Sequence, residues 1–176
     1  TITPEVVATI KEIETTHDCK IPVIAAGGIY TGANMYDIMQ LCADGVQLGT
    51  RFVTTTECDA SEIFKQAYID ATEADVEIIK SPVGMPGRAI FSDFLQKVKD
   101  GEKQPKSCPF HCIKTCQIET SPYCIMLALF NAYKGNMTMG YEYDGTNAHL
   151  ATAIVTVKDI MDAIQEEYKA REKELV

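Results

Sequence analysis

Apolar residues follow two different spacings along the first third of the chain, and together these predict a mixed α/β fold. Residues 21–26 (IPVIAA) and 45–49 (GVQLG) are short apolar runs of the kind found in buried strands. Between them, four apolar residues share the spacing of one helix face: Met35, Ile38, Met39 and Cys42. A strand–helix–strand order with tight connections predicts a βαβ unit in a parallel sheet.

The pattern is mostly helical elsewhere. A helix is predicted to open at Thr3, with Thr3 as its cap. Another is predicted near Ser61, and the residues on its inner side are Ile63, Phe64, Ala67 and Ala71. Residues 76–79 favour a brief strand, residues 81–88 (SPVGMPGR) a loop, and residues 90–98 a helix.

The last two helices have clear end signals. Ser121-Pro122 opens an apolar helix that Gly135 closes. Thr156 and Asp159 form a capping box for the final helix. Its apolar stripe comprises Val157, Ile160, Met161, Ile164 and Tyr168. From Gln165 onward the pattern becomes charged and predicts a solvated tail.

Composition narrows the classes of partner. The chain has 176 residues, 46% of them hydrophobic, which suffices for an ordinary packed core. Its net charge is −9 and it has no basic run, so neither a nucleic acid nor a membrane surface is an expected partner. The most apolar stretch, residues 123–133, is too short to span a bilayer. Seven cysteines, an odd number, and no visible signal peptide predict reduced thiols in a cytoplasmic protein.

Two glycine-containing turns follow the predicted strands. Gly27 and Gly28 end the first strand, and Gly49 with Thr50 ends the second. Ligands of α/β proteins bind at the carboxyl ends of parallel strands, and glycine lets an anion approach backbone N–H groups closely. A helix N-terminus behind the first turn would add donors, so the turns predict a phosphate site; the alternative is a pair of ordinary tight turns. Gln47 shares the strand parity of the glycines and either faces the ligand or is a hydrogen-bonded interior residue.

Residues 21–52 (IPVIAAGGIYTGANMYDIMQLCADGVQLGTRF) resemble the flavin-binding end of the nitronate monooxygenase family, formerly called nitropropane dioxygenases. The pattern is shared with flavin-type enoyl-acyl-carrier-protein reductases. The resemblance continues more loosely through SPVGMPGRAIFSDF, CPFHCIKTCQIETSPYCIMLAL and GTNAHLATAIVTVKDIM. It implies an FMN-dependent TIM barrel whose last two strands lead into turns that bind the FMN phosphate. Gly27, Gly28, Gly49 and Thr50 are then the phosphate ligands, with Gln47 a further contact.

The resemblance also implies an incomplete barrel. A (β/α)8 barrel needs about 250 residues and eight strands, whereas two barrel-like strands are recognisable here. The family's catalytic histidine lies in a Gly-Gly-His segment upstream of the matching region, and His17, His111 and His149 do not match it. We therefore expect the C-terminal portion of a barrel in residues 1–75, a mostly helical region in 76–176, and a catalytic base outside the chain.

Three further features have open interpretations. Cys108, Cys112 and Cys116 recur every four residues, with Cys124 eight further on. They would share a helix face, but the spacing fits no common zinc or iron–sulfur motif, and structural thiols are the preferred interpretation. Arg88 and His149 lie on loops that could edge a flavin pocket, or are ordinary surface residues.

The expected function is therefore oxidation of alkyl nitronates by FMN and O2, with this chain alone inactive. A rival enzyme is the enoyl reductase, which would use NAD(P)H and take an acyl-chain substrate. A rival of another class is a non-enzymatic cysteine-cluster module, or a subunit whose site a partner chain completes. Open barrel edges also predict self-association or pairing with a missing N-terminal half.

Overall fold

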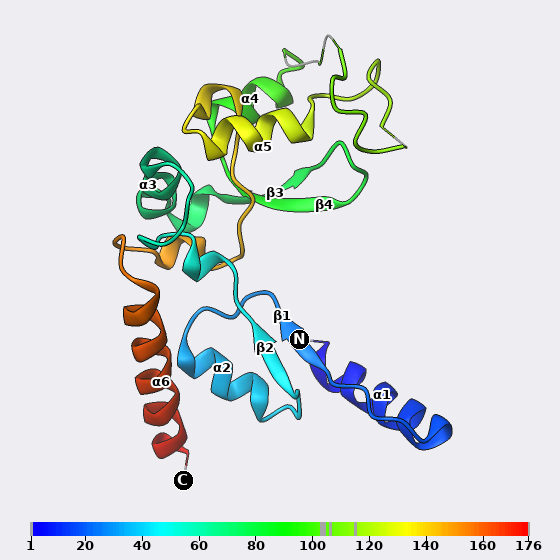
Figure 1. Ribbon diagram of the computed structural model, residues 1–176, viewed down its shortest axis with the longest axis vertical. Coiled ribbons are helices and arrows are strands. Elements are labelled where there is room, and N and C mark those ends of the chain that lie inside the picture. Colours follow the sequence, from blue (N-terminus) through cyan, green and yellow to red (C-terminus); the bar gives the residue numbers. More distant parts are fainter. Residues whose placement is uncertain (1, 103–104, 106, 115, 176) are drawn as a thin grey trace. The chain divides into compact units, whose positions relative to one another are not determined.

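The structure is a computed structural model that describes residues 2–102, 105, 107–114 and 116–175 (Figure 1). The chain forms two compact units. One comprises the described parts of residues 1–52 and 155–176, and the other comprises residues 53–154. This division differs from the boundary after residue 75 that the sequence suggested, because the C-terminal helix belongs with the N-terminal segment.

The first unit contains the predicted strand–helix–strand motif. Its elements are α1 (Thr3–His17), β1 (Ile24–Ala26), α2 (Gly32–Met39), β2 (Gly45–Gln47), η1 (Thr50–Phe52) and α6 (Val157–Glu174). Strands β1 and β2 are parallel, and the register pairs Ile24 with Gly45 and Ala26 with Gln47. The predicted parallel unit is confirmed.

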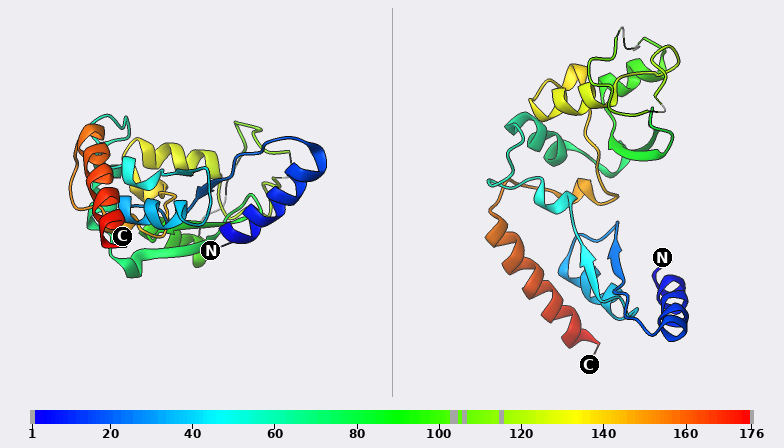
Figure 2. Two further views of the ribbon diagram at one scale, coloured as in Figure 1. Left: turned by 90° about the horizontal axis from the view of Figure 1, so that it is seen from below. Right: turned by 45° about the vertical axis from the view of Figure 1, so that its right-hand side comes forward.

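Helix α6 packs along α2, as the views in Figures 1 and 2 agree. The predicted Thr156–Asp159 capping box starts α6 and is confirmed. A Cβ added at Gly32 would collide with the carbonyl oxygen of Ile164 in α6, so glycine allows the two backbones to meet. Tyr36 and Tyr168 complete the contact edge to face, with ring centroids 5.2 Å apart.

Several details of the first unit differ from expectation. Ile24, in the run predicted to be a buried strand, is 54% exposed, because β1 pairs only with β2 among the described residues. Cys42 lies beyond the end of α2 with φ of 62°, so it does not extend the helix face. Thr3 is the first residue of α1 and not its cap, which is Ile2.

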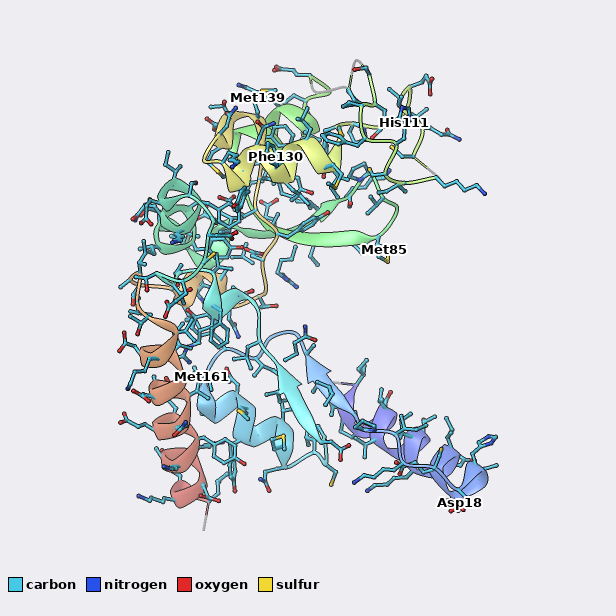
Figure 3. All side chains as sticks on the ribbon, in the orientation of Figure 1. Asp18, Met85, His111, Phe130, Met139 and Met161 are labelled. Carbon is cyan, nitrogen blue, oxygen red and sulfur yellow. The ribbon has the colours of Figure 1, made fainter. Side chains whose placement is uncertain are left out.

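The second unit is built on an antiparallel hairpin. It comprises α3 (Glu62–Asp70), η2 (Glu73–Asp75), β3 (Val76–Lys80), β4 (Pro86–Ile90), α4 (Asp93–Lys99), α5 (Ile125–Tyr133), η3 (Met137–Met139) and η4 (Ala148–Leu150). Strand β4 occupies the end of the expected loop over residues 81–88, so that prediction was wrong in its second half. Only the tip remains a turn, where Met85 is exposed (Figure 3).

Helix starts in this unit also lie later than the sequence suggested. Ile90 belongs to β4, and α4 begins after Ser92, whose hydroxyl accepts a hydrogen bond from the Leu95 amide. Helix α5 starts at Ile125, and Gly135, with φ of 85°, follows its end as predicted. Helix α4 starts late because strand β4 continues to Ile90, whereas turns and bends at residues 118–123 precede α5.

Aromatic side chains fill the core of the second unit. The Tyr123 hydroxyl donates to the Tyr141 hydroxyl at 3.0 Å, and Phe94 contacts both rings. A second cluster surrounds Tyr68, whose hydroxyl donates to the Tyr143 carbonyl oxygen at 2.6 Å. Of the residues expected on the inner side of α3, Phe64 and Ala71 pack in this cluster as predicted, whereas Ile63 is 59% exposed.

Candidate functional site

The two glycine turns leave the same end of the β1–β2 pair. Ala26 and Gln47 are register partners and are the last residues of their strands. Gly27 and Gly28 follow the first strand, and Gly49 with Thr50 follows the second at nearly the same level. Parallel strands therefore bring together four of the five residues predicted to bind a phosphate, and Gln47 adjoins them.

Each turn has its own reason for glycine. Gly27 and Gly28 have φ of 90° and 70°, a region that other residues rarely adopt. Gly49 has no such backbone requirement, and a Cβ added there would meet nothing within 4 Å. Neither the conformation nor a described neighbour thus demands glycine at position 49. A side-chain-free surface beside a strand end fits the close approach of a ligand's anionic group.

The side chain of Gln47 is exposed at the end of β2. The described residues do not enclose it, so the interior glutamine considered from the sequence is not what this structure contains. Thr50, the first residue of η1, is half-buried. Both residues lie in or next to the second turn in the sequence.

At the N-terminus of α2, two of the amides expected to be spare donors are bonded within the chain. The Asn34 amide donates to the Thr31 hydroxyl at 3.0 Å, and the Asn34 side chain accepts the Thr31 amide in return. The Gly32 amide donates to Glu167 Oε2 at 2.6 Å. The anion at this helix end is thus a carboxylate of the chain itself, which accepts the Gly32 amide and interacts favourably with the helix dipole.

Arg51 and Glu167 connect the two turns to α6. Arg51 Nη1 and Nη2 each bond one oxygen of the Glu167 carboxylate at 3.1 Å, and Nη1 also donates to the Tyr30 carbonyl oxygen at 2.6 Å. No sequence pattern predicted this contact, and the prediction that Glu167 lies in a solvated tail was wrong. The partners are 116 residues apart, and no periodicity links them.

The electrostatics of this cluster favour the ionised carboxylate. Burial by itself would raise the pKa of Glu167, but the bonds from Arg51 and from the Gly32 amide outweigh it and lower that pKa below its ordinary value. Burial raises the pKa of the Tyr30 phenol, and the Arg51 guanidinium offsets part of that rise. The positive charge of the Arg51 guanidinium is therefore balanced by the Glu167 carboxylate. Its Cζ lies 5.2 Å from the centroid of the Tyr30 ring.

The pattern of one known family matches nearly the whole chain: the family described as nitronate monooxygenase matches residues 2–167. The chain belongs to the nitronate monooxygenase family.

Individual relatives agree with this assignment. A probable nitronate monooxygenase of Staphylococcus aureus (strain MSSA476) is 30% identical over 149 residues, covering 83% of this chain and 39% of that protein. One from Staphylococcus saprophyticus is 37% identical over 89 residues, covering 51% of this chain and 25% of that protein. The chain thus spans well under half the length of these curated relatives.

Solved structures share the fold. FabK from Thermotoga maritima superposes with a TM-score of 0.71 at 29% identity, covering 92% of this chain and 49% of that one. Nitroalkane oxidase from Streptomyces ansochromogenes superposes with a TM-score of 0.67 at 22% identity, covering 98% and 45% respectively, a likeness of fold alone.

Arg88 and His149, the two loop residues considered from the sequence, lie in the second unit. Arg88 is in β4, where its carbonyl oxygen accepts the Asp144 amide at 3.1 Å. Burial raises the pKa of Asp144 to about 6, and the Arg88 charge limits that rise. His149 is in η4, and its Nδ1 is buried with no hydrogen-bond partner in the described part of the chain. The sequence did not separate these two residues from ordinary surface positions.

The clustered cysteines do not form the helix face that their spacing suggested, because residues 107–114 and 116–124 contain no helix. All four line one cavity of about 240 Å³ with His111, whose amide donates to Cys108 Sγ at 3.3 Å. They are free thiols. Within the described ranges, no three metal-ligating side chains are arranged to hold a metal ion.

Over the part of the chain that the structure describes, every helix is too short or too polar to cross a lipid bilayer.

Proposed function

We propose that this chain supplies the phosphate-binding end of an FMN-dependent oxidoreductase of the nitronate monooxygenase type. The observation that carries the proposal is the β1–β2 register, which starts the Gly27-Gly28 and Gly49-Thr50 turns from the same level of a parallel pair. Membership of the family supports the class of enzyme. The oxidoreductase activity would belong to a protein of full family length that contains this segment.

The residues at the turns suit a phosphate. In the proposal, the amides of Gly27, Gly28 and Gly49 and the backbone and hydroxyl of Thr50 approach its oxygens, and Gln47 contacts the cofactor from the strand end. Neutral donors suit a chain whose net charge is −9 and whose nearest arginine is already paired. The open space at Gly49 is where the anion would come closest to the backbone.

The chain would bind and orient, while the cofactor carries the oxidation. A bound flavin supplies the electron-accepting group for oxidation of an alkyl nitronate with O2. The turns hold its phosphate end and so orient the ring system. The proposal assigns no catalytic base to these residues, and the expected histidine has no counterpart in the sequence.

Strands β1 and β2 are proposed as the last two strands of a TIM barrel. The likeness to FabK supports this assignment. Active sites of such barrels lie at the carboxyl ends of the strands, which is where both turns are found. The exposed Ile24 side chain and the free edge of β1 in the described part of the sheet would be covered by neighbouring strands.

The Gly49→Ala variant tests the phosphate site. A methyl group there should weaken FMN binding by about tenfold or more, equivalent to about 1.4 kcal/mol, with little effect on folding. Riboflavin, which has the ring system without the phosphate, provides the control ligand and should bind both proteins equally. Equal FMN affinity for the wild type and Gly49→Ala would reject this site.

The flavin-type enoyl reductase stays a second candidate, since the sequence resemblance covers it and the fold is shared with an enoyl reductase domain of MlnA. The two differ in electron donor. A family-length protein that contains this segment should take electrons from an alkyl nitronate and consume O2. Anaerobic bleaching of its flavin by NAD(P)H, with none by a nitronate, would favour the reductase.

A further inference from the structure

We propose that Glu167 of α6 is a positioning residue for the phosphate turns, and that it acts by orienting Arg51. This inference rests on the proposed function for its consequence in FMN binding, but its structural basis can be tested separately. The Glu167 carboxylate accepts hydrogen bonds from the Arg51 guanidinium and the Gly32 amide, and it acts through these two groups.

Arg51 bridges the two turns directly. It follows Thr50 at the start of η1, so its backbone moves with the second turn. Its Nη1 donates to the carbonyl oxygen of Tyr30, which lies two residues after Gly28 and moves with the first turn. The guanidinium thus fixes the distance between two segments that would have to converge on one phosphate. Its side chain is only 12% exposed, so water competes weakly for these bonds.

Glu167 determines where that guanidinium points. Two parallel bonds from Arg51 to one carboxylate define the plane of the fork, which a single contact would not do. The same carboxylate accepts the Gly32 amide at 2.6 Å, so α6 fixes the start of α2 together with the arginine. Three segments far apart in the sequence therefore meet at one side chain.

The Arg171–Asp37 ion pair provides a matched control. It also joins α6 to α2, with Arg171 Nε donating to Asp37 Oδ1 at 2.9 Å. No turn residue takes part in it, and both its side chains are more exposed than Arg51. Loss of this pair should loosen the helix contact to a similar degree without releasing the turns.

The binding test compares Glu167→Gln with Arg171→Gln in the full chain. Glu167→Gln should weaken FMN binding by about tenfold while riboflavin binding changes by less than about twofold, and Arg171→Gln should alter neither. Arg51→Gln should weaken FMN binding similarly, and the double variant Arg51→Gln/Glu167→Gln should be no weaker than either single variant, because both act through one contact. An unchanged or higher FMN affinity for Glu167→Gln overturns the proposal, as does an equal loss in the control.

Hydrogen exchange separates this inference from the proposed function. If the wild-type chain binds FMN and riboflavin with equal affinity, the phosphate site itself is refuted, and the positioning role is judged on the amides alone. Faster exchange at residues 26–31 and 49–52 in Glu167→Gln than in Arg171→Gln supports the role. Equal exchange in the two variants refutes it, whatever FMN does.

Discussion

Glu142 is completely buried, and the protonation of its carboxyl group should make the stability of the second unit depend on pH. Tyr143 pairs with Ala89 of β4 in an antiparallel bridge. Because side chains alternate along an extended segment, those of Glu142 and Asp144 project to the face opposite the Tyr143 side chain. Neither carboxylate oxygen of Glu142 has a well-formed hydrogen bond among the described residues, and the nearby Glu142 amide offsets only part of the effect of burial on the pKa. Burial, with a smaller contribution from Asp144, raises the pKa of Glu142 to about 7.

The size and sign of the effect follow from this pKa. Below the unperturbed value of 4.5, Glu142 is protonated in both the folded and the unfolded chain and contributes no pH dependence. Between 4.5 and about 7 the unfolded chain releases the proton while the folded chain keeps it, so stability falls as pH rises. At about 1.4 kcal/mol per pH unit, the loss reaches about 3 kcal/mol and is then constant at higher pH.

Glu142→Gln removes this titration and keeps the shape of the protonated acid. The free energy of unfolding is measured by urea denaturation with circular dichroism. Between about pH 5 and pH 8, we expect the wild type to lose about 3 kcal/mol that the variant does not lose. Glu73→Gln, at an exposed carboxylate, is the control and should follow the wild type. Parallel pH profiles for Glu142→Gln and the wild type would refute the assignment of a neutral buried acid.

Four further outcomes are expected. Gly32→Ala should lower the thermal stability by about 1–3 kcal/mol, because its methyl group meets the α6 backbone, whereas Gly49→Ala should change it by less than about 0.5 kcal/mol; similar melting temperatures for both would contradict the packing argument. Folding lowers the pKa of Glu167, so its pairing with Arg51 stabilises the first unit above the ordinary carboxyl pKa. This stabilisation is lost as pH falls through the folded-state pKa. Thermal unfolding of Glu167→Gln at decreasing pH should not show this loss. Reduced, tag-free protein should contain zinc and iron far below one equivalent, and stoichiometric metal by elemental analysis would show the cysteine interpretation wrong. The polypeptide alone should consume no O2 with an alkyl nitronate, and measurable turnover would place a catalytic base within it.

Local signals were sufficient for the elements of the site. Glycine-bounded apolar runs and an intervening helical period predicted β1, α2 and β2 in the right order, since these patterns depend on neighbours a few residues away. The capping box at Thr156 was equally readable. The hairpin strand β4 was missed because Pro86 and Gly87 have the composition of a turn, and only the pairing partner β3 makes them a strand.

Long-range pairing could not be read in the same way. From Gln165 onward the helix has the charge density of a solvated helix. Helical spacing places Glu167 on the face of Ile160 and Ile164 and Glu166 off it, but no local signal says that Glu167 bonds Arg51. Ile63 and Lys65 show the same difficulty in α3, where the lysine is buried and the isoleucine exposed. Which face of a helix turns inward depends on what packs against it.

By itself the sequence determined the family, the parallel strand pair and the two glycine turns, because family motifs and strand periodicity are properties of contiguous residues. Tertiary structure alone decided that α6 joins the N-terminal unit, that Glu167 occupies the N-terminus of α2, and that Arg51 is neutralised beside the turns. Those features arise from side chains brought together across more than a hundred residues, where the free energy of each contact depends on burial that no local pattern encodes.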